Sequence, residues 1–165
     1  MSALADRLDV VNRRIGLAVR WLALAMAVLQ FGLVLARYGF GVSSILMDEG
    51  VLYLHATLFM LGAGYTFLAD GHVRVDIFQA KAGPRGKAAI DLFGHLVLLV
   101  PALGLLLWYS WPSVWRSWAI LEGSISVGGI PASFLLKTLI PLFCLLLLLQ
   151  ALARGLRDFA RLMAR

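Results

Sequence analysis

Four long runs of apolar residues, separated by shorter polar stretches, dominate the hydrophobic pattern of the chain. The runs cover residues 15–38, 50–69, 88–111 and 133–153. Each has about the 20 residues that an α-helix needs to cross the hydrocarbon core of a bilayer. They leave no room for a soluble domain. The pattern therefore predicts an all-α integral membrane protein, a single membrane domain over residues 1–165 with four transmembrane helices.

Residues 1–14 show a different pattern, in which Leu4, Leu8 and Val11 share one side of a helix and charged residues occupy the other sides. This is typical of a short amphipathic helix on the membrane surface, and a solvated tail is the alternative. The apolar run that follows continues well past the small residues that resemble a signal-peptide cleavage site. We therefore expect the first span to remain uncleaved.

The basic residues predict the orientation of the helices. Most of them lie in the N-terminal segment, in the connection 70–87 and in the C-terminal tail, whereas the connections 39–49 and 112–132 with their flanks carry only Arg37, Arg116 and Lys137. Lys and Arg collect on the cytoplasmic side of membrane proteins. Both termini and the 70–87 hairpin are therefore expected in the cytoplasm. Tryptophans near residues 108–118 indicate an aromatic belt at the outer interface, or else a docking face.

Composition supports a membrane protein and excludes several other classes. Hydrophobic residues make up 61% of the chain, where roughly half is usual in soluble domains. The net charge of +6 reflects cytoplasmic loops, because no basic patch is interleaved with stacking aromatics as nucleic-acid binding requires. Cys144 is the only cysteine, which excludes an internal disulfide or a Cys/His metal site. We therefore expect Cys144 to be a small packing residue.

Small and polar residues recur along single sides of three spans, which is typical of helix–helix contacts in lipid. His55 could also be a ligand or a proton carrier, although a hydrogen bond to a neighbouring helix is the more common role. One turn separates Asp91 from His95, and these two could pair. The contact stripes comprise Ala23, Gln30 and Arg37 in the first span, His55, Gly62 and Thr66 in the second, and Lys137 and Pro141 in the fourth.

Catalytic and cofactor chemistry finds little support in the sequence. No nucleophile–base pair, phosphate loop or carboxylate dyad is present. His55 and His95 are expected at different depths, which disfavours a shared haem. No internal repeat indicates a self-sufficient transporter. We therefore expect no enzyme activity and no cofactor, and the most plausible role is service in a larger assembly.

An ordered set of motifs indicates the kind of assembly to which the chain belongs. Asp48-Glu49 precedes Leu61-Gly62-Ala63-Gly64-Tyr65 and then Gly71-His72-Val73-Arg74-Val75-Asp76; later come Glu122-Gly123-Ser124, Gly128-Gly129-Ile130-Pro131, Lys137, Ile140-Pro141 and Leu149-Gln150. In length, layout and motif order the chain resembles the small membrane subunit of tripartite ATP-independent periplasmic (TRAP) transporters, the DctQ-like family. It departs from the family at Leu46, where a tryptophan is frequent, and at Gly123, where a serine is common.

The resemblance implies a set of partners in the bacterial inner membrane. A large multispan permease subunit carries the substrate and sodium sites, and a periplasmic binding protein delivers the substrate, typically an organic acid. The small subunit packs on the static scaffold of the large one. On this view the contact stripes of this chain face the large subunit, and membrane lipid is a further partner. Because the chain ends at Arg165, we expect it to be separate from the large subunit.

The resemblance also implies roles for two groups of residues. Asp48, Glu49, Arg116 and Glu122 would lie on the periplasmic side, where the binding protein docks; for the acidic pair, stabilisation of a helix N-terminus is the structural alternative. Gly71, His72, Arg74 and Asp76 would form a cytoplasmic hairpin motif that fixes the turn or binds a partner or lipid. An unrelated four-helix scaffold or regulator, and a small membrane enzyme, are the competing functions.

Overall fold

The chain folds into long α-helices in a computed structural model that describes residues 2–73 and 82–163. Four helical runs are long and apolar enough to cross a membrane, and the described residues contain no strand. The predicted all-α architecture with four spans is confirmed. The elements are α1 (Ser2–Phe40), α2 (Ile45–Leu68), α3 (Pro84–Phe93), the π-helix η1 (Gly94–Leu99), α4 (Val100–Ala119) and α5 (Ser133–Met163), with α3, η1 and α4 forming one continuous run.

The helices are longer than the predicted spans, and the N-terminal segment is not a separate helix. Helix α1 runs unbroken from Ser2 to Phe40. No proline interrupts this stretch, and Asp9 and Asn12 near its start form hydrogen bonds with α5. The helix therefore continues beyond its apolar part. Helix α2 likewise begins at Ile45, five residues before the predicted boundary.

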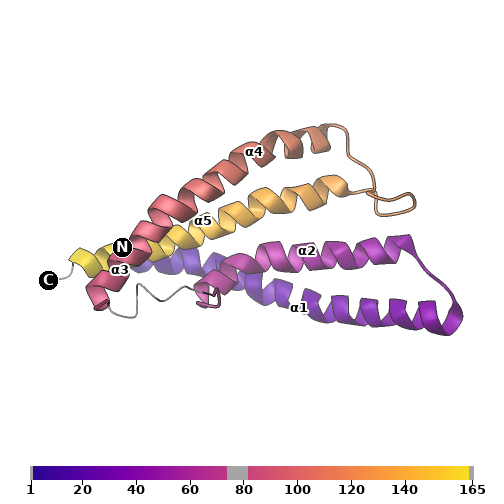
Figure 1. Cartoon of the computed structure of the whole chain (residues 1–165), viewed down its shortest axis with the longest axis horizontal. Helices are drawn as coiled ribbons and strands as arrows, with labels where there is room; N and C mark the ends of the chain where they lie inside the picture. The colour runs from indigo at the N-terminus through magenta and orange to yellow at the C-terminus, as the bar shows by residue number, and fades with distance from the viewer. Residues whose placement is uncertain (1, 74–81, 164–165) are drawn as a thin grey trace.

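Helix α5 organises the bundle. It contacts α1, α2 and the α3–η1–α4 run, whereas α4 contacts neither α1 nor α2. Figure 1 shows an α1–α2 hairpin and an α4–α5 hairpin that lie together where the chain termini meet and diverge toward their connections. We call these two ends the terminal end and the loop end. Residues 41–44 and 120–132 connect the helices at the loop end.

The apolar core lies where the hairpins meet. It is built from Ala63 and Phe67 of α2, Leu103 of α4, and Cys144, Leu147 and Ala151 of α5. Cys144 is fully buried, which confirms its predicted role as a packing residue. Small residues in this core allow the helix backbones to approach closely, as is usual in membrane bundles.

Proline accounts for the irregular turn between α3 and α4. Pro101 has no N–H to donate, and its ring would clash with the carbonyl one turn earlier in a regular α-helix. In the preceding turn the Val100 N–H bonds to the His95 carbonyl, five residues back. The widened turn lets the helix continue through Pro101 without a break.

Candidate functional site

Glu49 ties the two hairpins together at the loop end. Its carboxylate accepts hydrogen bonds from the backbone N–H groups of Ser126, at 2.9 Å, and Ile130, at 2.7 Å. The residue is only 6% exposed, although it was predicted to face a partner. A Cβ on Gly129 would lie 2.2 Å from this carboxylate. Glu49 therefore holds residues 126–130 over the start of α2, and glycine at residue 129 leaves room for it.

Glu122 fixes the α4–α5 connection from the other side. It lies 2.5 Å from the Lys137 ammonium and accepts a hydrogen bond from the Ser117 hydroxyl. The hydrogen bond from Lys137, together with the one from Ser117, holds the pKa of the Glu122 carboxyl below its ordinary value of 4.5. Ser133 adds a hydrogen bond to the Gly123 carbonyl. This connection is thus tied to both helices that it joins.

The other two residues predicted on this side remain exposed. Asp48 pairs with Arg37 across the α1–α2 hairpin, with an N–O distance of 3.2 Å. Arg116 donates a weak hydrogen bond to the Pro112 carbonyl, one turn earlier in α4. Both side chains lie at the surface of the loop end, so they are accessible to another protein.

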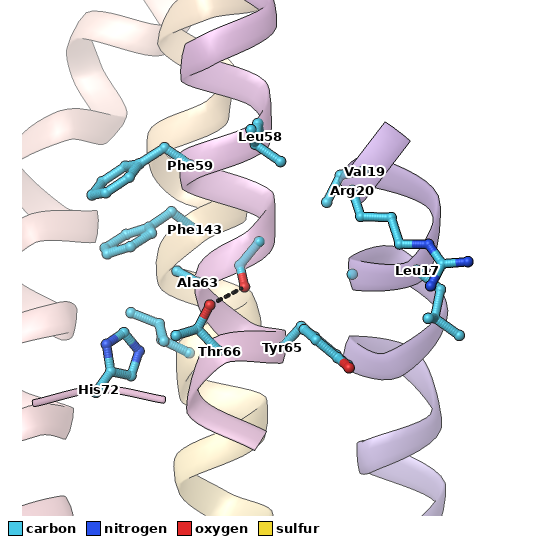
Figure 2. Close-up of a pocket in the computed structure, with 13 residues that line it drawn as sticks. Leu17, Val19, Arg20, Leu58, Phe59, Ala63, Tyr65, Thr66, His72 and Phe143 are labelled. Carbon is cyan, nitrogen blue, oxygen red and sulfur yellow. Dashed lines mark hydrogen bonds between the residues drawn. The ribbon is translucent and has the colours of Figure 1, made fainter. Parts of the chain in front are cut away.

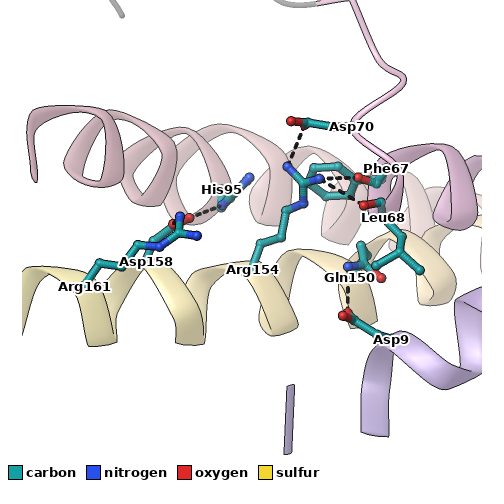
Figure 3. Close-up of polar contacts among 9 residues, drawn as sticks. All are labelled: Asp9, Phe67, Leu68, Asp70, His95, Gln150, Arg154, Asp158 and Arg161. Atoms are coloured by element: carbon teal, nitrogen blue, oxygen red, sulfur yellow. Dashed lines mark hydrogen bonds and ion pairs between the residues drawn. The ribbon is translucent and has the colours of Figure 1, made fainter. Parts of the chain in front are cut away.

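Arg154 caps helix α2 at the terminal end. Its guanidinium donates to the carbonyls of Phe67, at 2.6 Å, and Leu68, at 3.3 Å, and pairs with Asp70 at 2.9 Å (Figure 3). It also lies over the Phe67 ring. A cation that bonds the last carbonyls of a helix complements the helix dipole. Arg154 therefore fixes the point at which α2 ends.

The turn after α2 is a Schellman motif. The Gly71 N–H bonds to the Thr66 carbonyl and the Asp70 N–H to the Phe67 carbonyl, which is the pair of bonds that defines this cap. Asp70 occupies the left-handed position, with φ of 61°, where glycine is usual. The ion pair with Arg154 compensates for this less favourable backbone conformation.

A buried polar network joins the start of α1 to α5. The Asn12 amide donates to the Gln150 side-chain oxygen, at 2.8 Å, and to the Leu146 carbonyl, at 3.1 Å. Gln150 then donates to Asp9, and Arg157 bonds Asp9 at 2.6 Å. Asn12 and Gln150 are almost completely buried. These contacts place the N-terminal segment in the bundle.

Gly64 of α2 makes room for this network. A Cβ at this position would lie 2.2 Å from the Asn12 side-chain oxygen. Helices α1, α2 and α5 therefore meet around Asn12.

His95 contacts helix α5. Its Nδ1 lies 3.9 Å from a carboxylate oxygen of Asp158, whose other oxygen accepts a hydrogen bond from Arg161 (Figure 3). The imidazole also contacts the Phe67 ring edge-on, at 5.5 Å between centroids. His95 thus makes contacts across the bundle, and its expected pairing with Asp91 stays a prediction.

The predicted contact stripes divide into two groups. Lys137 is engaged with Glu122, and Pro141 is buried inside the bundle. Ala23, Gln30, Arg37 and His55, in contrast, are exposed, and Gly62 and Thr66 are partly buried. The stripe of α5 is used within the chain, whereas those of α1 and α2 remain open.

The hairpin motif is described only in part. Gly71 belongs to the Schellman motif, and His72 packs against the Phe67 ring at 5.9 Å. Arg74 and Asp76 lie outside the described residues. The expected role of this motif remains a proposal.

The two largest cavities of the bundle are grooves lined mainly by apolar side chains, whereas a smaller one of about 260 Å³ at the terminal end is lined mainly by charged side chains. One, of about 520 Å³, extends around α2; Figure 2 shows Phe59, Phe143 and His72 on one side of α2 and Tyr65 directed toward α1. A second, of about 580 Å³, lies between α2, η1 and α5 and shares His72 with the first. Among the described residues no group of His, Cys, Asp or Glu could hold a metal ion.

Sequence reasoning missed the residues that bind the terminal end together. Asn12 and Asp9 were counted with a surface helix, and Arg154 and Arg157 with a cytoplasmic tail. A signal was present in Gln150, an amide within an apolar run, because a buried amide needs hydrogen-bond partners. Its partners lie 138 and 141 residues away in the chain, and spacing alone could not identify them.

Comparison with known proteins places this bundle in a family. No curated protein matches the chain. The family described as "Tripartite ATP-independent periplasmic transporters, DctQ component" matches residues 26–161, which is most of the sequence. The match includes the Glu49 and Glu122 clusters and the Arg154 cap. The chain belongs to the DctQ family, the small membrane subunits of TRAP transporters.

Proposed function

We propose that this chain is a non-catalytic scaffold subunit of a sodium-coupled, binding-protein-dependent carrier for organic acids in the bacterial inner membrane. It associates with a large permease subunit, which carries the substrate and sodium sites. The observation that carries this proposal is the DctQ match over residues 26–161. The internal use of the polar clusters supports it, because Glu49, Glu122 and Arg154 hold the fold together.

The orientation follows the distribution of basic residues. With both termini in the cytoplasm, the loop end faces the periplasm and the terminal end faces the cytoplasm. The periplasmic surface then includes Asp48, Arg116 and residues 120–132. We assign the docking of the binding protein to this surface. Glu49 and Glu122 contribute indirectly, because they fix the shape of the connection that the binding protein meets.

A deletion experiment tests the scaffold role. In a strain that lacks this chain, the amount of large permease subunit in the membrane and the uptake of its substrate should both fall, and expression of the chain in trans should restore both. Undiminished uptake in the deletion strain would contradict the proposal. A normal amount of large subunit with lost uptake would overturn the stabilising role and leave the docking role.

A further inference from the structure

One side of the α1–α2 hairpin carries two residue series with a spacing of seven. Helix α1 contributes Ala23, Gln30 and Arg37. Helix α2 contributes Asp48, His55 and Gly62, and its C-cap residue Ala69 continues the series. Seven residues make about two helical turns, so each series stays on one side of its helix. We call this set of seven residues the hairpin face.

An ion pair shows that the two series lie next to each other. Arg37 is the last member on α1 and Asp48 the first on α2, and their side chains meet at 3.2 Å. Because the two helices are antiparallel, the two series run side by side from this ion pair toward the terminal end. A Cβ on Gly16, seven residues before Ala23, would meet the Tyr65 side chain at 2.3 Å, so the helices remain close along this length.

The hairpin face is open in the bundle. Six of its members are exposed and Gly62 is partly buried. The buried members of α2, which include Glu49, Ala63 and Phe67, lie on another side of the helix, where α5 packs. Only Gly62 of this face borders α5, since it lines a groove together with Phe143 and Leu147.

Two polar side chains on this face lie inside the predicted spans 15–38 and 50–69. His55 is ten residues from the start of α2 and Gln30 ten residues from the end of α1, which places each about 15 Å along its helix from the loop end. The hydrocarbon core is about 30 Å thick. Within the described residues the imidazole only stacks on Phe59, and Gln30 makes no hydrogen bond.

The outer side of the η1–α4 run has only apolar side chains along residues 96–108. In this stretch Leu98, Leu105 and Trp108 are all more than half exposed. Such a surface suits lipid chains, which cannot hydrogen-bond. A polar side chain in the same hydrocarbon is costly unless another protein group satisfies it.

We infer that the part of the hairpin face inside the predicted spans binds the large permease subunit. That subunit places there a transmembrane helix with hydrogen-bonding groups at the depths of Gln30 and His55. This inference rests on the proposed function. The small residues Ala23 and Gly62 let the partner backbone approach closely. The α4 side faces lipid.

Photo-crosslinking in native membranes tests the assignment. The photoreactive residue p-benzoylphenylalanine is introduced at Ala23 on the hairpin face or, as the matched control, at Trp108 on α4. Illumination should give a covalent adduct with the large subunit from residue 23 and lipid adducts from residue 108. An adduct of the large subunit from residue 108 alone, adducts of residue 23 with lipid only, or a cross-link between two copies of this chain would overturn the inference.

The polar contacts are tested with the variants Gln30→Leu and His55→Leu. Interhelical hydrogen bonds in membranes contribute modestly, so each variant should lower retention of the large subunit in detergent roughly threefold. Trp108→Leu serves as the control and should leave retention unchanged. Unchanged retention in both polar variants contradicts the inference. Failure of the unsubstituted chain to retain any large subunit would instead contradict the proposed function.

Discussion

The Glu49 carboxylate occupies the space that a side chain at residue 129 would need, since a Cβ on Gly129 would lie 2.2 Å from it. The same carboxylate accepts the Ser126 and Ile130 N–H groups. Residues 49 and 129 belong to different hairpins, which otherwise diverge at this end. One acidic side chain therefore ties residues 126–130 of the α4–α5 connection to the start of α2.

Replacement of Glu49 should loosen this connection. In Glu49→Ala two backbone N–H groups lose their acceptor, and such groups are costly when buried. We expect the Tm of the purified protein to fall by about 2–4 °C, as followed by circular dichroism in detergent. Gly129→Ala should give a similar decrease by displacing the carboxylate. Asp48→Asn, which affects only an exposed ion pair, should change Tm little; an equal effect of Asp48→Asn and Glu49→Ala would contradict this account.

Replacement of Arg154 and replacement of its ion-pair partner Asp70 should have unequal effects on the stability of the protein. Arg154→Ala leaves the last carbonyls of α2 without their donor and should destabilise the protein by about 2 kcal/mol. Asp70→Gly loses the ion pair but removes the left-handed strain of a non-glycine residue, worth roughly 1–2 kcal/mol, so its net effect should be small. Chemical denaturation in mixed micelles measures both. A larger loss for Asp70→Gly than for Arg154→Ala would show that the ion pair, and not the helix cap, is the main contribution.

The Asn12–Gln150 pair should behave as a coupled unit. Each single variant, Asn12→Leu or Gln150→Leu, leaves buried polar groups unpaired and should cost about 1–3 kcal/mol. The double variant should cost less than the sum of the two, with a coupling of roughly 0.5–3 kcal/mol. A double-mutant cycle of unfolding free energies gives this value. Strict additivity would mean that the two amides do not depend on each other.

Acid should weaken the Glu122 cluster. Lys137 and Ser117 lower the pKa of Glu122 below 4.5, so its contribution to stability is complete above 4.5, the ordinary value. The contribution is lost as the pH falls through the lower folded-state pKa. The Tm difference between the unsubstituted protein and Glu122→Gln should therefore shrink as the pH falls below 4.5. A difference that is constant from neutral pH to pH 3 would exclude this titration.

The sequence predicts the membrane helices well and their mutual contacts poorly. Apolar runs gave four spans because membrane thickness determines helix length, whereas the helix ends extend further through polar contacts that hydropathy cannot detect. Asp9 and Asn12 belong to the bundle because Gln150 and Arg157 meet them from the far end of the chain. Glu49 was recognised as significant from the family resemblance, but its burial depends on a connection that begins more than 70 residues later.

Affinity purification of the tagged chain from native membranes, followed by mass spectrometry, tests the central claim most directly. Membership in the DctQ family and the open hairpin face predict recovery of a large multispan permease subunit in an equal molar amount. Recovery of the chain alone, or as a homo-oligomer, in mild detergent would contradict the account of this protein as a scaffold for a larger carrier.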